Sequence, residues 1–264
     1  MSVPSEINRT HLLKWWIPIL AFGALLISGI ILGLTGGALR KDSTPFIAVG
    51  VAIAVVTFTT LRARRKVVAL FREPTPDRAI AYYHRTTIRI PNGEAMAAYL
   101  SAFAAVLYGQ FDRARDELAA VNWDSLPPMY QAFEAYIRYL LATFEAKDYS
   151  EAMRLAERIR ELGSVAGKLP GAALGKKGAE CNVAIAQFLL GGRSQELVNQ
   201  LKDATAKLPG VLPALPAWSL AQYYRDVGDP SRAEQYAAKV RELLPHSILL
   251  TSLDLAQQAS SATT

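Results

Sequence analysis

The chain has 264 residues, of which 51% are apolar, with 29 Lys and Arg against 23 Asp and Glu and a net charge of +6. This length suits one or two domains, and a single cysteine excludes an intramolecular disulfide. The first 66 residues hold eight basic and two acidic side chains, which is the whole excess, so the rest of the chain is neutral. Because nucleic-acid binding needs a basic face on the folded domain, the charge pattern argues against a nucleic acid partner.

Two apolar segments without charge, residues 15–34 and 46–61, are predicted to cross a membrane as a helical hairpin. The first is long enough for about 30 Å of hydrocarbon at about 1.5 Å per residue. The second is short, but it suffices if flanking arginines snorkel. Two alternatives stay open: a cleaved signal peptide for the first segment, and a buried core helix for the second. The length of the first disfavours cleavage, and the lack of a polar stripe in the second favours lipid.

A basic flank, residues 62–66, completes the predicted membrane anchor of residues 1–66 with Arg62, Arg64, Arg65 and Lys66. The positive-inside rule then predicts that both termini and residues 62–264 lie on the cytoplasmic side. The chain is therefore expected to be an integral membrane protein, and the bacterial cytoplasmic membrane is its expected location. The same four side chains are predicted to lie against anionic lipid headgroups of the bilayer.

After the apolar segments, a six-residue turn signature recurs five times, and its last residue falls at positions 79, 114, 152, 197 and 233. The steps of 35, 38, 45 and 36 residues are typical of stacked helix pairs. The clearest copies read Gly-Gln-Phe-Asp-Arg-Ala at 109–114 and Gly-Asp-Pro-Ser-Arg-Ala at 228–233. This pattern is similar to the tetratricopeptide repeat family. The resemblance implies an all-α fold, with an α-solenoid of about four to five helix pairs over residues 67–250 behind the hairpin.

Three stretches leave the boundaries of this array open. Residues 163–175 contain four glycines and are either a loop or a frayed helix start, which accounts for the longest step. Residues 60–73 either continue the second membrane helix directly into the first pair or lead into an extended linker, because Pro74 and Pro76 disfavour helix. Residues 251–264 are assigned to a polar C-terminal tail.

The resemblance also implies a concave groove, lined by the first helix of each pair, in which such arrays hold a peptide or a helix. Its lining is expected to be apolar and aromatic, which suits an apolar helix or an extended segment of a partner protein. For any one residue, packing between neighbouring helices is the alternative. The expected lining consists of Met96, Tyr99, Phe103, Val106, Ile137, Leu141, Phe144, Asn182, Leu189, Trp218, Gln222 and Arg225.

No group of residues in the sequence indicates catalysis. His11, His84 and His246 are far apart without metal-ligand spacing, and Cys181 is predicted to be buried and inert. We therefore expect no metal, no cofactor and no small-molecule substrate. The sequence favours a non-enzymatic membrane-anchored scaffold or adaptor for a partner protein. The alternative is a structural or assembly subunit of a membrane complex in which the hairpin makes the main contacts, and an enzyme with an unrecognised site is the least favoured reading.

Overall fold

The computed structural model describes residues 58, 61–62, 65–165 and 172–261. Apart from Phe58 and Leu61, the predicted spans 15–34 and 46–61 lie outside the described residues. Residues Arg64–Thr264 form one compact unit, and its described part contains helices and turns but no strand. Within the described ranges, no helix has both the length and the apolar character needed to cross a bilayer.

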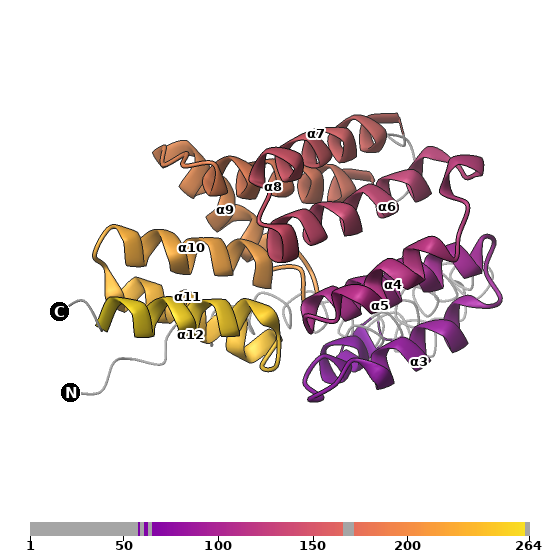
Figure 1. The fold of residues 1–264 in the computed structure, drawn as a ribbon, viewed down its shortest axis with the longest axis horizontal. Helices are drawn as coiled ribbons and strands as arrows, with labels where there is room; N and C mark the ends of the chain where they lie inside the picture. Colours follow the sequence, from indigo (N-terminus) through magenta and orange to yellow (C-terminus); the bar gives the residue numbers. More distant parts are fainter. Residues whose placement is uncertain (1–57, 59–60, 63–64, 166–171, 262–264) are drawn as a thin grey trace, which may run out of the picture. The chain divides into compact units, whose positions relative to one another are not determined.

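The helices pack in chain order, each pair against the next, as Figure 1 shows. A helical stretch at residues 65–70 precedes α3, and a π-helical turn, Ala142–Ala146, extends α6. This arrangement confirms the prediction of an all-helical, solenoid-like array. The helices are α3 (Asp77–Thr87), α4 (Gly93–Leu107), α5 (Phe111–Ala119), α6 (Pro128–Leu141), α7 (Tyr149–Val165), α8 (Ala172–Leu189), α9 (Gln195–Lys207), α10 (Ala214–Asp226), α11 (Pro230–Leu243) and α12 (Ile248–Ser261).

The recurring signature forms the turn between the two helices of a pair. Gly109, Lys147 and Gly228 open three of these turns with φ of 72°, 53° and 76°, and Gly191 does so in a fourth with φ of 99°. A left-handed residue here ends the first helix and redirects the chain. The residue that closes each signature lies buried between helices, at Ala79, Ala114, Ala152, Leu197 and Ala233.

Exchanging the residue types at two of these turns should change stability in opposite directions. Lys147→Gly is expected to raise the free energy of unfolding by about 0.5–1 kcal/mol, because glycine adopts positive φ without steric cost. Gly228→Ala is expected to lower it by about 1 kcal/mol. A Cβ atom at Gly228 meets nothing within 4 Å, so only the backbone is strained. Urea denaturation of the two variants measures both changes, and shifts of the same sign would contradict this account.

The described chain enters the array through the helical stretch at residues 65–70, which is the first helix of the first pair. Phe71 follows it and is 1% exposed. The Tyr108 hydroxyl donates to the carbonyl oxygen of Glu73 at 2.7 Å and lies 3.1 Å from that of Phe71. The turn before α3 is thus held against the end of α4. Continuity between residues 65–70 and the second apolar segment lies outside the described residues.

The C-terminal segment differs from the polar tail expected at residues 251–264. It belongs to α12, which packs on α10 and α11 and runs to Ser261. Leu249, Leu250 and Leu253 are buried, at 0%, 8% and 2% exposure. A short apolar run before a polar sequence has too few turns to give a clear helical period, so the sequence alone did not indicate this helix.

The glycine-rich stretch 163–175 is partly helical. α7 continues through Gly163 to Val165, and α8 begins at Ala172, ahead of Gly175. Residues 166–171 between them lie outside the described ranges. The long third step of the repeat therefore reflects longer helices as well as a connection.

Candidate partner-binding surfaces

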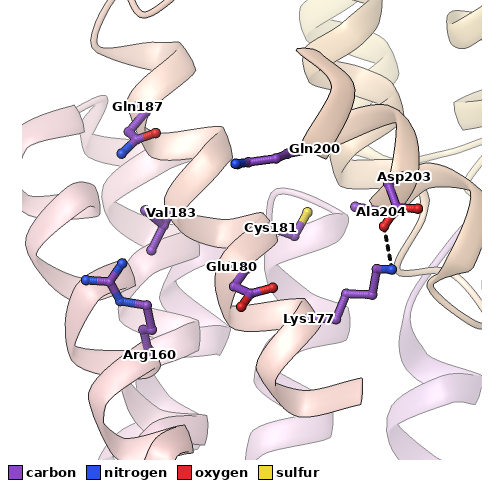
Figure 2. A pocket seen from close by; sticks show the side chains of 9 residues that line it. All are labelled: Arg160, Lys177, Glu180, Cys181, Val183, Gln187, Gln200, Asp203 and Ala204. Atoms are coloured by element: carbon purple, nitrogen blue, oxygen red, sulfur yellow. Dashed lines mark ion pairs between the residues drawn. The ribbon is translucent and has the colours of Figure 1, made fainter. Parts of the chain in front are cut away.

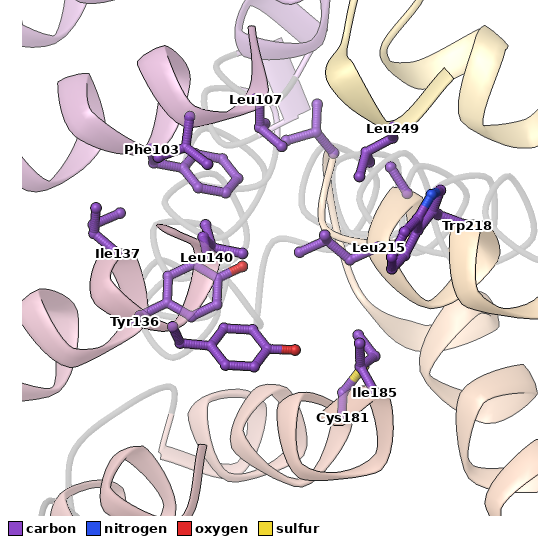
Figure 3. Close-up of a cluster of buried hydrophobic side chains, with 14 of the residues drawn as sticks. Phe103, Leu107, Tyr136, Ile137, Leu140, Cys181, Ile185, Leu215, Trp218 and Leu249 are labelled. Atoms are coloured by element: carbon purple, nitrogen blue, oxygen red, sulfur yellow. The ribbon is translucent and has the colours of Figure 1, made fainter. Parts of the chain in front are cut away.

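The first helices of successive pairs share one interior, which Figure 3 shows at close range. Leu107 of α4, Ile137 of α6, Ile185 of α8 and Leu249 of α12 face this interior and are each at most 1% exposed. α12 packs against α4 as well as against α10. The last helix of the array thus closes the concave face by reaching the first helix of the second pair.

The residues expected to line an open groove are mostly inside this closed face. Five are buried, namely Phe103, Val106, Ile137, Asn182 and Trp218. Five are partly buried and packed against the core, namely Met96, Tyr99, Leu141, Phe144 and Leu189. Gln222 and Arg225 are partly exposed, although one guanidinium nitrogen of Arg225 is buried without a hydrogen-bond partner among the described residues. Five residues of the expected lining are therefore core residues, and the other seven keep part of their surface exposed.

Aromatic contacts explain why the concave face is filled. Tyr99 stacks on Phe133 with ring centroids 4.3 Å apart. Trp218 lies edge-on to Phe144 at 5.1 Å, and its indole Nε1 donates to Oγ of Ser252 at 2.8 Å. Since Ser252 is on α12, this hydrogen bond attaches the closing helix to α10. Large side chains from several helices thus pack against one another in this interior.

The one cysteine lies beside this core and is held as a neutral thiol. Burial raises the pKa of Cys181 to about 12, and burial also raises the pKa values of Tyr136 and Tyr139 above their usual range. A thiolate is the reactive form of cysteine. These side chains therefore act as core residues, as the sequence predicted for Cys181.

Cys181 is expected to resist alkylation by iodoacetamide at pH 8 in the native chain and to react readily in denaturant. The thiol of the unfolded chain ionises near pH 9, whereas the buried thiol of the folded chain ionises only near pH 12. The contribution of Cys181 to the free energy of unfolding is therefore fully present below about pH 9 and is lost as the pH rises toward about 12. Urea midpoints measured from pH 8 to 11 should therefore fall. Equal alkylation rates in native and unfolded chains would contradict the burial of this thiol.

An open cleft of about 410 Å³ lies between α7, α8 and α9 (Figure 2). Nζ of Lys177 is 2.5 Å from Oδ2 of Asp203, and Asp203 also pairs with Lys207. Hydrogen bonds from the two lysines lower the pKa of Asp203. The residues that line the cleft are Arg160, Lys177, Glu180, Cys181, Val183, Gln187, Gln200, Asp203 and Ala204.

The cleft offers groups that suit a polypeptide main chain. Gln187 and Gln200 are exposed, and each side-chain amide both donates and accepts hydrogen bonds. From Lys177 to Gln187 the cleft follows α8 for about 15 Å, at about 1.5 Å per residue. That distance matches about four to five residues of extended chain. Sequence reasoning missed this surface because its residues come from three helices and share no motif.

The predicted headgroup-binding residues lie at the start of the described array. Arg62 and Arg65 are exposed, and Arg64 lies outside the described residues. Nζ of the exposed Lys66 is 4.6 Å from the ring centroid of Tyr82. A shallow hollow of about 370 Å³ beside them is lined by Arg65, Val68, Ala69, Arg72 and Gly210. The array is therefore basic where the chain enters it.

Within the described residues, no group of three or more His, Cys, Asp or Glu side chains is placed to hold a metal ion. His84 lies 3.7 Å from Glu117, as an isolated pair. Comparisons with protein-family models, curated proteins and solved structures found no match to this chain.

Proposed function

We propose that this chain is a non-enzymatic scaffold or adaptor that holds a partner protein at a membrane through a tetratricopeptide-like array. The observation that carries the proposal is the cleft along α8, where exposed polar side chains of three helices surround about 410 Å³. The predicted spans 15–34 and 46–61 supply the membrane attachment. The left-handed turns and the recurring helix pairs support the family resemblance.

The cleft is a better partner site than the concave face. Binding at the concave face requires α12 to leave, which exposes Leu249 and breaks the hydrogen bond between Trp218 and Ser252. Binding in the cleft requires no such change, because Gln187 and Gln200 are already exposed. An extended partner segment pairs its main chain with these amides, because each amide both donates and accepts hydrogen bonds.

Site-specific photocrosslinking in native membranes tests the cleft. A photoreactive amino acid replaces Gln187 or Gln200 in the full chain, and Gln235 on α11, which is also exposed, serves as the matched control. We expect a discrete crosslinked partner from both cleft positions and not from Gln235. Identical crosslinks from all three positions, or none from the cleft, would overturn a partner site in this cleft.

The second candidate is an assembly subunit of a membrane complex in which the hairpin makes the main contacts. It is favoured by the burial of the concave face, because a filled interior leaves fewer surfaces on the array for a client. Replacing residues 1–61 by an unrelated two-span anchor separates the two functions. An adaptor keeps its cleft crosslinks after this exchange, whereas an assembly subunit loses its complex.

A further inference from the structure

The most exposed large apolar side chain in the described array, Ile88, lies in the connection between α3 and α4. Ile88 is 75% exposed, and Ile90, two residues later, is 44% exposed. Two exposed arginines, Arg85 and Arg89, accompany them. The end of α3 and the connection therefore combine apolar and basic side chains within six residues, which is a composition typical of segments that lie at a membrane interface.

The fold places this connection at the edge where the chain enters the array. Residues 65–70 and α3 are antiparallel neighbours, since Lys66 lies over the ring of Tyr82 and Glu73 pairs with Arg78. Following α3 past Tyr82 therefore leads back toward the start of the helical stretch at 65–70. The connection between α3 and α4, visible in Figure 1, comes after that end of α3.

The other exposed apolar side chains of the array lie at the opposite edge. Leu190 and Val227 are 51% and 54% exposed, and they follow α8 and α10 at the turns within pairs. Connections between pairs, such as the one after α3, lie at the other ends of the helices. Ile88 therefore differs from Leu190 and Val227 in two ways other than exposure. It lies at the edge where the chain enters the array, and it has exposed arginines beside it.

We propose that the connection between α3 and α4 is a second membrane contact, which rests on an anionic bilayer surface. Ile88 and Ile90 enter the boundary between headgroups and acyl chains, and Arg85 and Arg89 pair with lipid phosphates. The exposed Arg65 and Lys66 at the entry edge extend the same basic surface. This contact rests on the membrane attachment in the proposed function. This second contact fixes the orientation of the array on the membrane, whereas the spans alone only attach it.

Depth-dependent fluorescence quenching of the full chain tests this contact. The chain carries Cys181→Ala, to remove the native thiol, and Ile88→Cys labelled with an environment-sensitive fluorophore. It is reconstituted in phosphatidylglycerol vesicles with or without brominated acyl chains. Val227→Cys, of similar exposure at the opposite edge, is the matched control. We expect a blue shift and quenching for the probe at position 88 and neither for the probe at 227, with less quenching when Arg85 and Arg89 are both replaced by Gln.

The outcome separates this contact from the anchor itself. Alkaline carbonate extraction of the same vesicles reports whether the chain is integrated. If the chain stays in the membrane but the probe at 88 behaves like the probe at 227, the second contact is overturned and the anchor stands. If the chain is extracted, the membrane attachment of the proposed function fails, and the contact that rests on it fails too.

Discussion

Replacing Leu249 by Asp is expected to release α12 from the array. Leu249 is on α12 and is 0% exposed, so the new carboxylate is placed out of contact with water. An uncompensated buried charge costs on the order of 3–5 kcal/mol. Detaching one terminal helix avoids most of that cost. We therefore expect faster hydrogen exchange throughout α12 and in the facing parts of α4 and α10.

Thr251→Asp is the matched control for this experiment. Thr251 lies two residues further along the same helix and is exposed, so the same carboxylate there should leave exchange rates within error. If Leu249→Asp leaves the protection of α12 intact, then α12 does not close the concave face. If the exposed interior of this variant captures a protein that the native chain does not, the concave face is a latent binding surface.

Ile137→Ala is expected to lower the free energy of unfolding by about 2–5 kcal/mol. Ile137 is 0% exposed in the middle of α6, and the removed atoms leave a cavity that close-packed neighbours fill only in part. Arg138→Ala is the matched control. Arg138 is exposed and pairs with Glu134 across one helical turn, so its loss should cost less than about 1 kcal/mol.

Urea denaturation of the two variants, followed by circular dichroism, measures both changes. A cost for Ile137→Ala no larger than that for Arg138→Ala would mean that α6 does not face a packed interior. The result also decides how binding experiments are interpreted. A partner lost on truncating Ile137 or Phe103 cannot be taken as a groove contact, because both side chains are buried. Changes at the exposed Gln187 and Gln200 do not carry this ambiguity.

The helix pairs could be predicted from the sequence because their signals are local. Glycine at 109 and 228 allows the left-handed turn, and alanine at 114 and 233 allows the close crossing that follows it. Each signature spans six residues, so its meaning does not depend on distant parts of the chain. The non-glycine turn at Lys147 adopts the same conformation, which shows that the surrounding repeat outweighs the preference of one residue.

The candidate site could not be predicted in the same way. The spacing of Phe103, Ile137 and Trp218 on their helices indicated that they share a face, but spacing is the same for an open groove and for a closed core. Whether an open groove or a closed core results depends on how tightly the array of helix pairs curves. It also depends on whether another helix covers the concave face. α12 decides this, and its sequence carries only a short apolar run at 248–250, followed by Leu253 and Leu255 among polar residues.

The sequence by itself determined the all-helical class, the five turns and the residues buried at each crossing, because backbone conformation and helical period act over a few residues. Only the tertiary structure decided that the concave face is closed, that a polar cleft opens between α7, α8 and α9, and that Ile88 lies at the entry edge. These features depend on side chains from different helices, as in the hydrogen bond from Trp218 to Ser252 and the ion pair of Lys177 with Asp203. Contacts of that kind arise from packing and leave no period in the sequence.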